Sequence, residues 1–221
     1  PAMNEADSGS GQCLRIGHRG AAGHAPENTL PSLERAIALG VDLVAFDVRR
    51  SADGALVLLH DPTVDRTTNG KGKVEALPLH KLRSLDAGIG ERIPLLEEAL
   101  ACLSGRAGAM IEMKVPGIAA EVSRVVQTSP FQGPVIFASF IHQELSAVRK
   151  VKNQSDILAL FEKMHAGLAL KIASAGLVRR FQAMGIRVFV FTVDEPEDIN
   201  RMRSLGVDGI ISNFPDRGEG F

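Results

Sequence analysis

Short apolar runs alternate with segments of helical periodicity along nearly the whole chain. Seven apolar runs have the length and composition of buried strands: 14–17, 43–48, 109–113, 135–138, 157–161, 188–193 and 209–211. A first helix fits a stripe of Leu33, Ala36 and Ile37 that Gly40 ends. Later helices fit at 95–103, 118–127, 143–151, 172–184 and 195–205. This alternation of strands and helices predicts a parallel β-sheet or barrel.

Two stretches interrupt the alternation. Residues 61–92 are rich in turn-forming residues, and we interpret them as an insertion too short to fold as an independent domain. Further along, five residues at 162–166 separate the strand ending at Phe161 from a possible eighth strand at 167–171. A parallel crossover needs about a dozen residues or more. This link is therefore either irregular or shortened by an omitted segment, and we favour the omission.

The composition argues against several functional classes of protein. The 221 residues are 45% hydrophobic with a net charge of −1, and they include no Trp or Tyr. Without a basic field or a stacking surface, nucleic acid is not an expected partner. No run of 18 apolar residues exists that could span a membrane. We expect one domain over 13–221, preceded by a flexible tail of small and polar residues at 1–12.

The two cysteines indicate a reducing compartment. Cys13 and Cys102 lack the spacing of a metal site. We expect both to be reduced and buried, in a cytoplasmic protein without a structural disulfide.

A hairpin brings chemically active side chains together. Asp53-Gly54 lies between two apolar runs and is a strong signal for a two-residue turn. With these two residues in the turn, Asp47 lies directly opposite His60, with Cβ atoms roughly 5 Å apart. Taken alone, the same hairpin could carry the two residues incidentally at the surface. In this geometry Asp61 points to the other face and supports a turn with Pro62.

Other polar residues end the neighbouring strands. His18 ends the first apolar run, Asp47 ends the second, and Glu112 with Lys114 ends the third. In parallel α/β barrels the active site forms at the carboxyl ends of the strands. We therefore expect these four residues and His60 to converge on one rim.

The motifs that carry these residues resemble those of a known family. In chain order they are His18-Arg19-Gly20, Pro26-Glu27-Asn28-Thr29, Asp47-Val48, Asp53-Gly54, His60-Asp61-Pro62, Glu112-Met113-Lys114 and the closing Gly206-Val-Asp-Gly-Ile-Ile211. Each motif is weak alone, but their order and spacing are specific. Together they resemble the glycerophosphodiester phosphodiesterase family from about Ile16 to Pro215.

The resemblance implies a fold and a reaction. The expected fold is a TIM-type (β/α)8 barrel with a small turn-rich insertion, about 61–92, after the second strand hairpin. The expected reaction is hydrolysis of small glycerophosphodiesters to sn-glycerol 3-phosphate and an alcohol, with a divalent cation, Mg²⁺ or Ca²⁺. Oxygen ligands suit these hard cations. Two groups that titrate near neutrality suit proton removal from the nucleophile and proton delivery to the leaving alkoxide.

The resemblance also implies the role of individual residues. His18 and His60 match the general acid and base, and Asp47 and Glu112 match carboxylates that hold the metal. Arg19 and Lys114 match the groups that hold the phosphate.

Two further positions border the expected substrate site. Glu27 belongs to a motif at the edge of this site. Phe191 lies near the end of the run 188–193, which is the seventh strand when the possible strand at 167–171 is counted. The family often has Trp there, and Phe191 could pack on the glycerol or fill the barrel.

One expected metal ligand is missing. The family's second strand usually carries Glu-x-Asp, whose two carboxylates share a face. Here Ala45 stands where the first carboxylate belongs. Loss of a supporting partner already costs roughly 10–100-fold in metal affinity or activity, and loss of a direct ligand should cost at least as much. We expect folding and phosphate binding with little or no turnover, after either an engineered Glu→Ala change or a recent natural loss.

Two other functions remain possible besides a phosphodiesterase of reduced activity. Because Ala45 provides no carboxylate for a metal, the same pocket could bind glycerophosphodiesters as a sensor without hydrolysing them. A related phosphodiesterase could act on lysophospholipids or sphingolipids, although the sequence shows no obvious amphipathic membrane stretch. The alcohol of the substrate, the choice of metal and the oligomeric state do not follow from the sequence.

Overall fold

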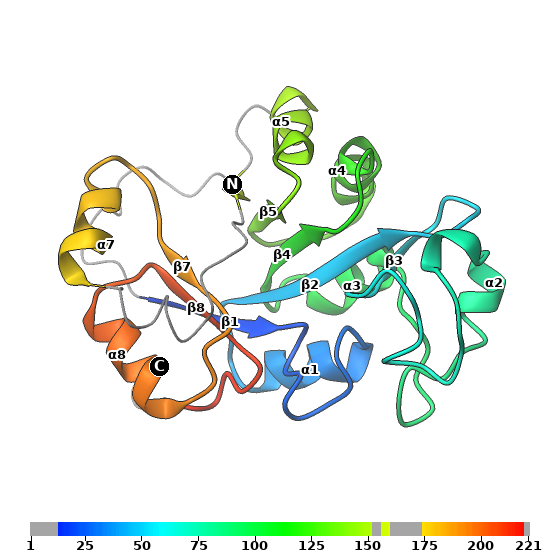
Figure 1. Cartoon of the computed structure of the whole chain (residues 1–221), viewed down its shortest axis with the longest axis horizontal. Helices are drawn as coiled ribbons and strands as arrows, with labels where there is room; N and C mark the ends of the chain where they lie inside the picture. Colours follow the sequence, from blue (N-terminus) through cyan, green and yellow to red (C-terminus); the bar gives the residue numbers. More distant parts are fainter. Residues whose placement is uncertain (1–12, 152–155, 160–173, 219–221) are drawn as a thin grey trace.

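The computed structural model describes residues 13–151, 156–159 and 174–218. Within them, seven parallel strands form one curled sheet in the order β6-β5-β4-β2-β1-β8-β7, and β3 pairs with β2 in the antiparallel sense (Figure 1). The strands are β1 (Leu14–His18), β2 (Leu43–Arg50), β3 (Leu56–Leu58), β4 (Gly108–Met113), β5 (Val135–Ser139), β6 (Asp156–Ala159), β7 (Phe189–Val190) and β8 (Gly209–Ser212). The parallel α/β architecture predicted from the sequence is therefore confirmed.

Helices connect the strands and follow the predicted periodicity. They are α1 (Leu30–Ala38), α3 (Leu96–Leu103), α4 (Ala119–Thr128), α5 (His142–Val151), α7 (Ala175–Gln182) and α8 (Pro196–Ser204). The possible eighth strand at 167–171, the short link at 162–166 and the predicted tail at 1–12 lie outside the described residues. No helix formed by the described residues is long and apolar enough to cross a membrane.

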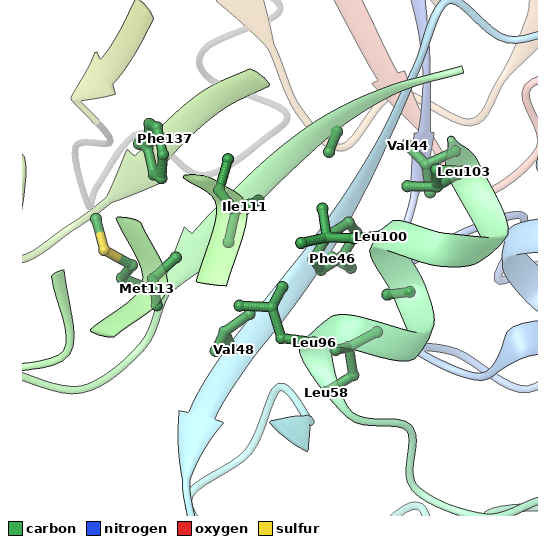
Figure 2. Packing of buried hydrophobic residues seen from close by; sticks show 14 of the residues in the cluster. Val44, Phe46, Val48, Leu58, Leu96, Leu100, Leu103, Ile111, Met113 and Phe137 are labelled. Atoms are coloured by element: carbon green, nitrogen blue, oxygen red, sulfur yellow. The ribbon is translucent and has the colours of Figure 1, made fainter. Parts of the chain in front are cut away.

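Alternate residues of β2 face opposite sides of the sheet, as strand geometry requires. On the outer side, Val44 and Phe46 belong to a buried cluster with Leu96, Leu100 and Leu103 of α3 (Figure 2). The odd positions face inward, where Ala45 packs in a second cluster with apolar residues of four other strands. Asp47 follows at the next inward position. The packing of the sheet therefore turns this acid toward the interior.

The register of the β2–β3 hairpin differs from the prediction by one residue. Val48 pairs with Leu58, so the residue opposite Asp47 is Leu59 rather than His60. The turn contains three residues, because the amide of Ser51 donates to the carbonyl of Ala55. Gly54 has a φ of 90°, as the last residue of a three-residue hairpin loop requires. Asp-Gly suits both loop lengths, which explains the error.

The segment 61–92 lies beyond the carboxyl end of β2 (Figure 1). It contains a short 3-10 helix η1 (Val74–Ala76) and the helix α2 (Leu79–Leu82). Val64, Val74, Leu82 and Ala87 of this segment form a buried cluster with Val57 and with the nearby Leu59 and Ile93. Its own apolar contacts thus fix the segment against the hairpin.

Candidate active site

The predicted site residues lie at the carboxyl edge of the sheet. Asp47 of β2 stands beside Glu112 of β4 in the strand register, and His18 of β1 stands beside Ala45 of β2. Lys114 follows β4, and its amide donates to the carbonyl of Val48. The backbone pairing alone therefore brings acidic and basic groups from three adjacent strands to one edge.

Asp47 is the most buried charged residue of this edge, with 2% of its surface exposed. Its Oδ2 accepts a hydrogen bond of 2.9 Å from Nδ2 of Asn28, whose Oδ1 accepts from the Asp47 amide at 3.1 Å. Arg19 Nε lies 3.3 Å from Oδ2, and Lys114 Nζ lies 3.6 Å from Oδ1. Burial alone would raise the pKa of Asp47, but Lys114, Arg19 and Asn28 together hold it below its ordinary value.

Glu112 has the opposite electrostatic character. Burial and the neighbouring charge of Asp47 raise the pKa of Glu112, although Lys114 Nζ donates to its Oε1 at 2.6 Å. Lys114 therefore touches both acids at once. Its ammonium also lies 5.6 Å from the centre of the Phe140 ring.

His18 is held through one ring nitrogen by residues that the sequence interpretation missed. The Nδ2 of Asn213 donates to Asp194 at 2.7 Å, so its Oδ1 is left to accept from His18 Nδ1 at 2.8 Å. This bond places the proton of neutral His18 on Nδ1. Burial and the charge of Arg19 lower the pKa of His18. Asp194 and Asn213 follow β7 and β8, so the rule of carboxyl ends, applied to these strands, would have found them.

His60 is held through the same ring nitrogen but by a charged partner. Its Nδ1 donates to Asp61 Oδ1 at 2.6 Å, and Arg49 fixes its carbonyl through Nε at 2.9 Å and Nη2 at 2.6 Å. Asp61 thus also holds His60, a contact that the sequence interpretation did not predict. Burial lowers the pKa of His60, partly offset by the charge of Asp47. His60 follows Leu59, whose amide donates to the carbonyl of Asp47 at 3.1 Å, so its backbone stays next to Asp47 despite the shifted register.

Glu27 links Arg19 to a further residue that the sequence interpretation missed. Arg19 Nη1 donates to Glu27 Oε1 at 2.8 Å, and Arg66 donates to both Glu27 oxygens at 2.7 and 2.8 Å. No periodicity marks Arg66, because it lies in the turn-rich segment and reaches the site only after that segment folds.

Phe191 lies just beyond β7 and is 40% exposed. Its ring makes an edge contact with Phe140 at 6.2 Å between centroids. Because Phe140 also contacts Lys114, the two rings form an aromatic wall beside the basic group. An exposure of this size is typical of a rim residue rather than of a side chain that fills a barrel.

Ala45 leaves the acidic set incomplete. Its side chain faces the interior and is 8% exposed. Among the residues that the structure describes, no group of three or more His, Cys, Asp or Glu side chains could hold a metal ion. The two acids present are already paired with Lys114. Asp47 and Glu112 alone are therefore an incomplete set of carboxylate ligands for a divalent cation.

The loop after β1 requires glycine at position 20. Gly20 has a φ of 88°, and a Cβ there would lie 2.6 Å from the carbonyl oxygen of Ser32. We expect Gly20→Ala to lower the free energy of unfolding by roughly 2–3 kcal/mol, from backbone strain plus this clash. Gly54→Ala is the matched control, because φ is 90° but no atom lies within 4 Å, and it should cost about 1 kcal/mol. Equal losses in chemical denaturation would show that the contact with Ser32 contributes nothing.

The fold and this edge define an α/β enzyme that combines two imidazoles with a buried acid and two basic groups. The sequence model of the glycerophosphoryl diester phosphodiesterase family matches residues 18–170 and 162–217. The chain belongs to this family.

Individual relatives agree. A glycerophosphodiester phosphodiesterase of Caldanaerobacter subterraneus subsp. tengcongensis is 36% identical over 230 residues, covering 92% of this chain and 95% of the relative. A phosphodiesterase structure from Oleispira antarctica, in complex with its product sn-glycerol-3-phosphate, superposes with a TM-score of 0.81 at 28% identity, covering 91% and 93% of the two chains. A glycerophosphodiester phosphodiesterase structure from Agrobacterium tumefaciens gives 0.78 at 28% identity, covering 93% and 98%.

Proposed function

We propose that this chain hydrolyses glycerophosphodiesters to sn-glycerol 3-phosphate and an alcohol, with His18 and His60 as the acid–base pair. Both rings bond through Nδ1, which leaves Nε2 of each to exchange a proton with the substrate. Arg19 and Lys114 hold the negative phosphoryl group, and Phe191 covers the glycerol. The product bound in the Oleispira antarctica relative supports this choice of substrate.

The observation that carries the proposal is the position of the two basic groups. Arg19 and Lys114 lie on opposite oxygens of Asp47, at 3.3 and 3.6 Å. His18 ends β1 at the same edge, and His60 follows Leu59, whose amide donates to the carbonyl of Asp47 at 3.1 Å. A phosphoryl group bound between the two cations would therefore meet both imidazoles. Positive groups fixed in advance at this position stabilise the charge that develops on the phosphoryl oxygens.

We further propose that turnover is impaired because Ala45 replaces a metal-binding carboxylate. Asp47 and Glu112 would supply the remaining two protein ligands for Mg²⁺ or Ca²⁺. Position 45 lies on the same strand face as Asp47, so a glutamate there would place a third acid beside these two.

The test is the substitution Ala45→Glu. We expect it to raise the rate of Mg²⁺-dependent hydrolysis of glycerophosphocholine by roughly 10–100-fold, because a direct ligand and its negative charge are restored. The measurement is the release of sn-glycerol 3-phosphate at saturating Mg²⁺, repeated with Ca²⁺.

Ala45→Gln is the matched control, since it adds the same volume without the charge, and it should give no gain. Equal rates for the chain with Ala45 and for Ala45→Glu would refute the idea of impairment. If neither protein releases product but both bind glycerophosphocholine in calorimetry, binding without hydrolysis would replace the proposed activity.

A further inference from the structure

Arg66 binds two carboxylates from different parts of the chain with all three of its guanidinium nitrogens. Nη1 and Nη2 donate to Glu27 at 2.8 and 2.7 Å. Nε donates to Asp61 Oδ2 at 2.6 Å, and Nη2 also reaches Asp61 Oδ1 at 3.2 Å. The planar guanidinium therefore fixes the two acids relative to each other, which a lysine ammonium cannot do.

Each of the two carboxylates also accepts a hydrogen bond from a residue of the proposed active site. Glu27 Oε1 also accepts from Arg19 Nη1 at 2.8 Å, beside Asp47. Asp61 Oδ1 also accepts from His60 Nδ1 at 2.6 Å. One side chain thus connects a phosphate-binding arginine to a proton-transferring histidine through two short chains of hydrogen bonds.

The backbone that carries Arg66 is fixed by the fold. Val64, two residues earlier, is fully buried in the apolar cluster beneath the segment 61–92. Thr68, two residues later, donates from its amide and its hydroxyl to the carbonyl of Val64, at 3.1 and 2.7 Å. The guanidinium is therefore presented from a closed turn.

The pKa shifts of the two carboxylates agree with their hydrogen bonds to Arg66. Hydrogen bonds from Arg66 hold the pKa of Asp61 well below its usual range. Burial would raise the pKa of Glu27, but Arg66 and Arg19 keep it below its ordinary value. Both carboxylates are thus ionised at neutral pH and can only accept hydrogen bonds. His60 consequently keeps a proton on Nδ1 while Asp61 stays in place.

We propose that Arg66 is a positioning residue that orients His60 through Asp61 and Arg19 through Glu27. The segment 61–92 is then part of the active site, although it supplies no group that touches the substrate. The proposal deepens the hydrolysis proposed above and rests on it for the kinetic part of its test.

The kinetic test compares variants of Arg66 in the full chain, with and without Ala45→Glu. We expect Arg66→Met to lower kcat/KM for glycerophosphocholine by roughly 10–100-fold, because small misplacements of reacting groups have effects of this size. Arg66→Lys should recover only part of the loss. Lys73→Met is the matched control: it removes one positive charge from the same segment, at a side chain that is 68% exposed and pairs only weakly with Glu75 at 3.7 Å. It should leave kcat/KM unchanged.

Single and double substitutions distinguish the connection from Arg66 to His60 through Asp61 from the one to Arg19 through Glu27. Glu27→Gln should chiefly raise KM, through Arg19, and Asp61→Asn should chiefly lower kcat, through His60. Adding Arg66→Met to Asp61→Asn should then lower kcat little further, because coupled residues are not additive. Full additivity of Arg66→Met with both carboxylate variants, or equal effects of Arg66→Met and Lys73→Met, would overturn the proposal.

A spectroscopic readout keeps the proposal testable if no variant hydrolyses the substrate. In the native chain, the Nδ1 proton of His60 should give a slowly exchanging, hydrogen-bonded NMR signal. Arg66→Met and Asp61→Ala should both broaden or remove this signal, and Lys73→Met should leave it unchanged. An unaltered His60 signal in Arg66→Met would overturn the proposal whatever the activity. The expected change without hydrolysis would uphold the positioning and refute only the function.

Discussion

Replacing His18 or His60 with alanine is expected to lower kcat for glycerophosphocholine hydrolysis by about 10²–10⁴-fold, the usual contribution of a general acid or base. The reaction needs a proton removed from the nucleophile and another delivered to the leaving alkoxide. The bonds of the two rings to Asn213 and Asp61 engage Nδ1 of each, which leaves Nε2 for the proton transfers of the proposed reaction. The measurement is the initial rate of sn-glycerol 3-phosphate release in the Ala45→Glu background.

A third histidine gives the matched control for this prediction. His80 lies on α2, is exposed, and belongs to none of the contacts that hold the proposed site. His80→Ala should therefore keep the starting kcat. A His18 or His60 variant that keeps kcat within about twofold would lose its assigned role, since a general acid or base contributes far more than this.

Much of the framework could be predicted because its signals are local. Helix periodicity placed α3 at 95–103, and the structure places it at Leu96–Leu103. Parallel strands end at one edge, so the rule of carboxyl ends brought Asp47, Glu112 and Lys114 together, as their contacts confirm. The order and spacing of the motifs resemble one family, and the family match confirms this resemblance.

The errors arose where tertiary contacts decide the outcome. The hairpin register depends on Ser51, whose hydroxyl accepts from the Ala55 amide at 2.8 Å and donates to Asp53 at 2.6 Å, stabilising a three-residue loop. The predicted strand ends at His60, two residues beyond the observed end of β3, so it gives no hint of the bond between Asp61 and His60. Arg66 carries no signal in the sequence, since its importance follows from two carboxylates that lie 39 and 5 residues away.

Asp47 should be the acid on which folding depends most. Replacing it with asparagine is expected to lower the free energy of unfolding at pH 7 by about 3 kcal/mol, the low end for breaking a buried ion pair. The low end applies because each cation keeps a second partner, Arg19 with Glu27 and Lys114 with Glu112. Asp65→Asn is the control, because Asp65 pairs with Lys71 at the exposed surface, and its loss should change the free energy of unfolding far less.

The loss of stability in Asp47→Asn should also depend on pH, and the direction of this dependence follows from the pKa of Asp47. The pKa of Asp47 is lower in the folded chain than its ordinary value of about 3.9. Its ionised form therefore stabilises the fold fully above about pH 4, and this contribution is lost as the pH falls through the lower folded-state pKa. The difference in stability between the native chain and Asp47→Asn should be constant near neutrality and shrink below about pH 4. Urea unfolding at several pH values measures it, and a difference that grows with acidity would show that Asp47 is not held ionised by Arg19 and Lys114.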